Sequence, residues 1–139
     1  MQQAMHTLIV KTSGRGFTEI TSDIANWLSR QKVATGLLTV FCRHTSASLL
    51  IQENADPDVL KDLEAFFERI APEEPDRYVH DAEGPDDMPS HIRAALTQTQ
   101  LSIPVASGEM VLGTWQGLYL FEHRRAPHRR EIVLHLIGK

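Results

Sequence analysis

Seven short segments of the chain have the apolar pattern of β-strands. In some, apolar and polar residues alternate, and in others the apolar run is continuous and bounded by turn residues. Glycines and basic residues separate the later segments. The predicted strands cover residues 8–11, 37–43, 48–52, 102–105, 109–112, 118–123 and 131–137.

Apolar residues at helical spacing predict two or three helices, over about residues 21–35, 57–71 and 90–99. The second has the clearest start, because Asp56 can accept free backbone N–H groups and Pro57 suits a first turn. The helices do not alternate regularly with the strands. The pattern therefore predicts an α+β fold with curved mixed or antiparallel β structure.

Length and composition indicate one domain over residues 1–139, with 42% hydrophobic and 23% charged residues. No apolar run is long enough to span a bilayer, and no basic region followed by an apolar stretch opens the chain. We therefore expect a cytoplasmic protein without a membrane partner. The one cysteine, Cys42, excludes an internal disulfide and is expected to be a buried, inert thiol.

Charge is unevenly distributed along the chain. Residues 73–91 hold seven acidic side chains and one arginine, whereas residues 123–131 hold four arginines and one glutamate. Such opposite blocks could meet in the fold or at a subunit boundary. Few aromatic residues lie among the arginines and the net charge is −4, so no nucleic-acid partner is expected.

The acidic block contains the main candidate site, residues 80–91. His80 and His91 bracket four carboxylates, and one glycine and two prolines prevent a single regular helix or strand. Composition alone leaves two interpretations open, a site for a metal ion or proton transfer and a solvated acidic loop. Asp86 and Asp87 are expected only to cap the following helix or to solvate the turn.

Other candidates lie at strand ends. His44 follows an apolar strand, and Ser46 nearby suits a hydrogen-bonding role better than a nucleophilic one. Trp115 and Gln116 could hold a flat polar ring or form a turn whose tryptophan is buried. Glu122 and the basic block after it offer a carboxylate and guanidinium groups for a phosphate, or only surface pairs.

These elements together resemble the YjbQ family (UPF0047), also named secondary thiamine-phosphate synthase. The resemblance extends from about Leu8 to Gly138. It rests on His44-Thr-Ser-Ala-Ser48, Asn54-Ala-Asp-Pro-Asp58, Tyr78-Val-His-Asp81, Asp86-Asp-Met-Pro-Ser-His91, Ile103-Pro-Val105 with Gly108, Gly113-Thr-Trp-Gln-Gly117 and Glu122-His-Arg124.

The resemblance implies a small α+β fold that assembles as a homotrimer, with a shared pocket containing His44, His80 and His91. Three imidazoles from separate positions can bind zinc or another divalent metal ion. Three carboxylates could orient the histidines or hold a harder cation such as magnesium. These are Asp81, Glu83 and Glu122.

The activity implied by the resemblance is thiamine-phosphate synthesis, a transferase reaction in which a thiazole nitrogen displaces diphosphate from a pyrimidine methylene carbon. Arg124 or Arg129 could stabilise the diphosphate, Trp115 and Gln116 could position a heterocycle, and a histidine could donate a proton. Two alternatives remain. One is a metal-dependent phosphate-ester hydrolase, and the other a non-enzymatic trimeric module that binds a metal or metabolite.

Overall fold

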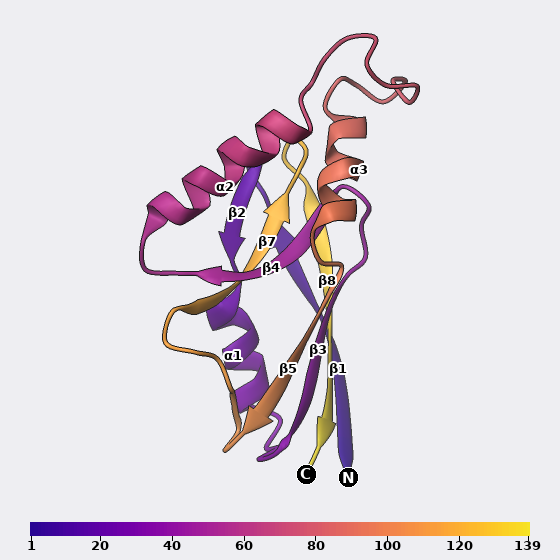
Figure 1. Cartoon of the computed structure of the whole chain (residues 1–139). Coiled ribbons are helices and arrows are strands. Elements are labelled where there is room, and N and C mark those ends of the chain that lie inside the picture. Colours follow the sequence, from indigo (N-terminus) through magenta and orange to yellow (C-terminus); the bar gives the residue numbers. More distant parts are fainter.

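Strands far apart in the sequence pair into two antiparallel sheets in this computed structural model, which describes residues 1–139 (Figure 1). The larger sheet has the order β1-β8-β3-β5-β6, and the smaller has the order β2-β7-β4. The larger contains β1 (Gln2–Lys11), β8 (Arg129–Gly138), β3 (Gly36–Cys42), β5 (Gln100–Ala106) and β6 (Glu109–Met110). The smaller contains β2 (Gly16–Glu19), β7 (Gln116–Glu122) and β4 (Ala47–Glu53).

The core lies between the two sheets and α1 (Thr21–Ser29). Burial alternates along β5 because successive side chains point to opposite faces, so that Ile103 faces the core and Ser102 faces solvent. From α1, Ile24 and Trp27 pack into the same cluster. The opposite face of the larger sheet, here named the outer sheet face, carries exposed apolar side chains: Met5, Leu37, Phe41 and Ile137.

Two further helices, α2 (Pro57–Ile70) and α3 (Asp87–Leu96), lie at the end of the molecule away from both termini (Figure 1). Asp56 caps α2 by accepting the Asp58 N–H at 2.9 Å, as the sequence predicts. Phe67 anchors α2 by packing edge to face with Phe121, with 5.4 Å between the two ring centroids. The long connection between α2 and α3 projects beyond the sheets and carries much of the acidic block.

The α+β prediction is confirmed, and all strand pairs are antiparallel. Several boundaries differ from expectation. β1 begins at Gln2 rather than residue 8, α1 ends at Ser29 rather than near residue 35, and β6 ends at Met110 rather than residue 112. Strand β2 is not among the predicted strands, and it forms because pairing with β7 supplies its hydrogen bonds. Helix α3 begins at Asp87 rather than near residue 90, since Pro89 lies in a first turn whose N–H groups need no helical partner.

Cys42 is buried, as expected. No helix in the chain has both the length and the apolar character needed to cross a membrane.

Candidate functional site

A cluster of two imidazoles and two carboxylates lies where the α2–α3 connection enters α3. His80 and Glu83 come from the connection, and Asp87 and His91 from the helix. Because Asp87 and His91 are four residues apart, a helix places their side chains on one face, one turn apart. The early start of α3 is therefore what brings Asp87 into the cluster.

One carboxylate oxygen of Asp87 is the centre of this cluster. Its Oδ2 lies 2.6 Å from His80 Nε2 and 3.0 Å from His91 Nε2. Glu83 Oε2 lies 3.4 Å from His80 Nε2. The four ligand atoms all lie within 4.8 Å of one another, close enough for one ion to reach them all.

The tautomer of His91 follows from its second nitrogen. The partner of Nδ1 is the Thr45 carbonyl oxygen at 2.9 Å, so Nδ1 carries a hydrogen and donates it. In a neutral imidazole, Nε2 then presents a lone pair to Asp87 Oδ2. Two acceptors facing each other at 3.0 Å require a positive charge, either a proton on Nε2 or a metal ion shared with the carboxylate.

Asp87 is held in place from its other side by the basic block. It is only 2% exposed, and its Oδ1 accepts a hydrogen bond from Arg124 Nη1 at 2.7 Å. Burial opposes the charged form, but hydrogen bonding from His80 and the charges of His91 and Arg124 hold the pKa of Asp87 below its usual value. Reciprocally, the hydrogen bond to Asp87 raises the pKa of His80.

Arg124 connects several parts of the acidic block. Its Nε donates to Asp86 Oδ2 at 3.0 Å, and its Nη2 donates to the Glu83 carbonyl oxygen at 3.0 Å. These bonds lower the pKa of Asp86 despite its burial and raise that of Arg124. The opposite charge blocks therefore meet within the chain, one of the two arrangements that the sequence allows.

The third predicted histidine, His44, lies outside the four-residue cluster. Its Nε2 accepts the Glu131 N–H at 2.8 Å, and burial followed by the charge of Arg130 lowers its pKa. The next residue, Thr45, contacts His91 through its carbonyl oxygen, so the strand end of His44 does border the cluster. Participation of His44 in metal binding stays a prediction.

Glu122 is the last residue of β7, two residues before Arg124, and is fully buried. Its oxygens accept hydrogen bonds from Thr12 and Arg130 and from the N–H groups of His123 and Arg124. Burial raises the pKa of this carboxyl, but these donors lower it overall. Its visible role is to hold the strand end that carries Arg124, and a catalytic role stays a prediction.

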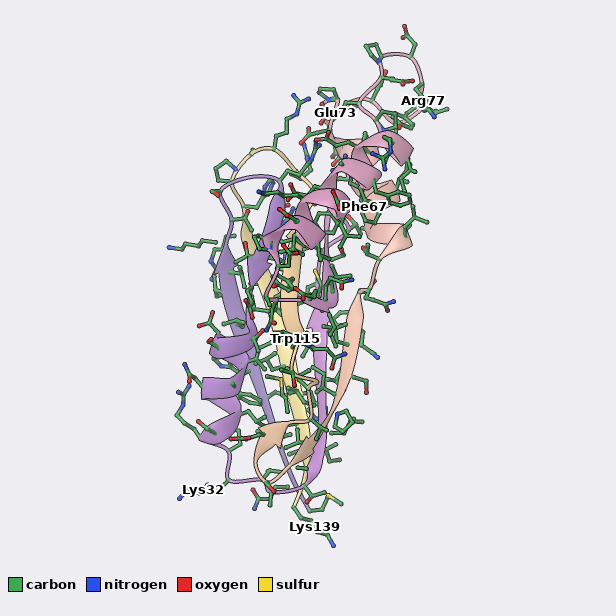
Figure 2. All side chains as sticks on the ribbon, turned by 60° about the vertical axis from the view of Figure 1, so that its left-hand side comes forward. Lys32, Phe67, Glu73, Arg77, Trp115 and Lys139 are labelled. Carbon is green, nitrogen blue, oxygen red and sulfur yellow. The ribbon has the colours of Figure 1, made fainter.

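The remaining candidates are spread over the surface. Ser46 Oγ accepts from Arg130 Nη2 at 3.0 Å, Asp81 is exposed in the connection, and Arg129 lies 3.4 Å from Glu131. Trp115 is 61% exposed and lies well away from Glu73 and Arg77 (Figure 2). Gln116 is the first residue of β7, and Glu122 is the last. Within one chain Trp115 and Gln116 do not reach the cluster.

Asp87 makes contacts that the sequence does not predict. The sequence predicts that it caps the helix or solvates the turn, but Asp86 holds the N-cap position and the Asp87 side chain lies between two imidazoles. The signal was present in the four-residue spacing from Asp87 to His91. It was missed because the predicted helix began after Asp87.

Fold and site define a small α+β protein with a carboxylate–imidazole cluster at the start of a helix. The chain matches the family model described as UPF0047 protein YjbQ-like over residues 6–139, and it belongs to this family. A Synechocystis relative, UPF0047 protein sll1880, is 51% identical over 99% of this chain and 94% of its own length. UPF0047 protein YjbQ of Escherichia coli O157:H7 is 45% identical over 96% of each chain.

Solved structures agree. A YjbQ/UPF0047 family protein from Clostridium acetobutylicum superposes with a TM-score of 0.87 at 34% identity, covering 95% of this chain and 99% of that one. The conserved hypothetical protein TT1486 from Thermus thermophilus has a TM-score of 0.84 at 33% identity, covering 95% and 99%.

Proposed function

We propose that His80, Asp87 and His91, with Glu83, hold a divalent metal ion. The observation that carries this proposal is the position of Asp87 Oδ2 between two imidazole nitrogens, one of which already uses its Nδ1 hydrogen elsewhere. The mixed nitrogen and oxygen donors favour zinc over magnesium, which prefers oxygen ligands. When bound, such an ion supplies positive charge for a phosphate group and lowers the pKa of bound water.

The reaction we propose acts on a phosphorylated small molecule, with thiamine-phosphate synthesis as the activity implied by the family. A cavity of about 280 Å³ next to the cluster supports a small-molecule substrate. Tyr78, His80 and Met88 form part of its wall, and the Tyr78 hydroxyl donates to the Pro72 carbonyl oxygen at 2.7 Å, which fixes the ring. The wall would orient one ring while Arg124 keeps Asp87 charged and in place.

We also propose that the working form is a homotrimer. Its support is the outer sheet face, where apolar side chains such as Phe41 and Ile137 are more than a third exposed on a regular, antiparallel surface. Gln116 lies six residues along β7 from Glu122, about 20 Å at the usual strand rise, and Trp115 directly precedes it. They would therefore reach a substrate at the cluster from a neighbouring subunit.

The deciding experiment is product analysis with both thiamine precursors present and then with each omitted. Transfer predicts release of diphosphate only when the thiazole phosphate is present, together with thiamine phosphate. Release of diphosphate from the pyrimidine diphosphate without the thiazole phosphate favours the hydrolase. In that reaction water would reach the substrate at the exposed imidazoles. Binding of either precursor without turnover favours the non-enzymatic module.

The metal is tested in the same preparations, made without a histidine tag. We expect near-stoichiometric metal in the native protein and its loss in Asp87→Asn, with Asp62→Asn on the exposed surface of α2 as the matched control. Full activity of metal-free protein, or equal metal content in both variants, would contradict the proposal.

A further inference from the structure

A second polar cavity, of about 240 Å³, opens beside α2 and α3, and all but one of its lining residues are charged. Three guanidinium groups and two carboxylates surround it, contributed by four segments that are far apart in the sequence. The lining residues are Arg15, Glu68, Pro72, Glu73, Arg93 and Arg125. Figure 2 labels Glu73 near the end of the molecule that carries the α2–α3 connection.

Arg93 is the unusual member of this cavity. It is only 2% exposed, yet no carboxylate forms an ion pair with it, and its only hydrogen bond runs from Nη2 to the Ala71 carbonyl oxygen at 3.4 Å. Its Nε is buried without a partner. A buried guanidinium with its donors unused is costly, and folded proteins normally pair such a charge.

The carboxylates of the cavity do not neutralise Arg93. Glu73 is shared by two other arginines, with Oε1 2.6 Å from Arg15 Nη2 and Oε2 in contact with Arg125 Nη2. Glu68 is exposed on α2. Burial lowers the pKa of Arg93, and the charges of Glu68 and Glu64 oppose this shift, but neither carboxylate forms an ion pair with it. The most buried cation of the cavity therefore faces it with unused N–H groups.

We propose that this cavity is a binding site for a phosphate group, carried by a small phosphorylated metabolite or by free inorganic phosphate. Guanidinium groups present several N–H donors in one plane and match the oxygens of a phosphate. Arg93 forms the floor of the site, and Arg15 and Arg125 lie at its walls. The ligand would supply the hydrogen-bond acceptors that the chain does not offer to Arg93.

This site goes beyond the function proposed for the metal cluster, since it shares no lining residue with that cluster. The two are nevertheless neighbours. Asp86 Oδ2 accepts hydrogen bonds from the Arg125 backbone N–H at 2.9 Å and from Arg124 Nε at 3.0 Å. Arg125 lines the cavity, and the adjacent Arg124 contacts Asp87 of the metal cluster. A phosphate bound at Arg125 could therefore shift the position of Arg124, the arginine that holds Asp87.

Calorimetric titration of the metal-free full chain with inorganic phosphate and with methyl phosphate tests the proposal. We expect saturable binding with one site per chain, and the tighter of the two ligands identifies the source of the phosphate group. Arg125→Gln should weaken binding about tenfold, the loss expected for one charge-assisted hydrogen bond. The matched control is Arg43→Gln, because Arg43 and Arg125 side chains are 57% and 62% exposed.

A second variant separates binding from folding. Arg93→Met fills the same space without a charge, so it should lose the rise in melting temperature that phosphate gives the wild type, while remaining folded without phosphate. Asp87→Asn should keep phosphate binding, which distinguishes this site from the metal cluster. Absence of saturable binding, or equal weakening by Arg125→Gln and Arg43→Gln, would overturn the proposal.

Discussion

Arg124 donates a hydrogen bond to one oxygen of Asp87, at 2.7 Å, and thereby leaves the other oxygen facing both imidazoles. This contact connects the basic block to the centre of the acidic block. It also gives the proposed metal site a second layer of ligand support, the type of contact that sets the orientation and charge of a metal-binding carboxylate.

The first prediction tests that contact. Arg124→Gln removes the charge that holds Asp87 in place, so affinity for zinc should fall about 10- to 100-fold. Zinc titration against a competing chelator measures the change. Arg43→Gln, which removes an exposed arginine elsewhere, should leave the affinity unaltered. An unchanged zinc affinity in Arg124→Gln would contradict a role for Arg124 in supporting the metal site.

The second prediction concerns the buried pair of Glu122 and Arg130. Both side chains are at most 4% exposed, and Arg130 donates to both oxygens of Glu122. Glu122→Gln leaves Arg130 without a counter-charge and should lower the free energy of unfolding by about 3–5 kcal/mol. Glu131→Gln breaks the more exposed pair with Arg43 and should cost less than about 1 kcal/mol. Urea unfolding at one protein concentration gives both values. Similar losses of unfolding free energy in the two variants would contradict a special stabilising role for the buried pair.

The third prediction concerns pH. His123 is fully buried beside Ser48, and burial followed by the charge of Arg93 lowers its pKa to about 3. An unfolded histidine takes up a proton near pH 6.5, so between about pH 6.5 and 3 the unfolded chain binds more protons than the folded one. Stability must then fall as pH falls, by about 1.4 kcal/mol per pH unit from this group.

His123→Gln lacks this contribution, although it can still place an amide near Ser48. The free energy of unfolding of the wild type should therefore decrease more steeply than that of His123→Gln between pH 6 and pH 4.5. Urea unfolding at three pH values measures the two slopes. Parallel slopes would mean that His123 is protonated in the folded protein.

The fourth prediction concerns assembly. A trimer should have a mass about three times the 15.7 kDa of the chain in light scattering. Phe41→Lys places a charge on the outer sheet face and should shift the mass toward the monomer. Phe66→Lys is the matched control, because Phe66 lies on α2 and the two phenylalanines are 45% and 43% exposed. A monomeric wild type would contradict both the trimer and a pocket shared between subunits.

Local signals predicted much of the fold. The alternation along β5 and the cap at Asp56 depend on neighbours in the sequence, and both are found where the pattern places them. Boundaries of helices and strands that depend on distant partners were harder to predict from the sequence. Strand β2 exists because β7 pairs with it, and the start of α3 depends on how Pro89 is accommodated.

The candidate site divides in the same way. The sequence by itself determined which segment carries the cluster of candidate ligands, because residues 80–91 hold two histidines and four carboxylates. Only the tertiary structure decided that Asp87 is its centre, since that depends on a helical turn and on Arg124 arriving from the far end of β7. Arg93 shows the same limit. Its lack of hydrogen-bond partners follows from packing among segments that local sequence patterns cannot relate.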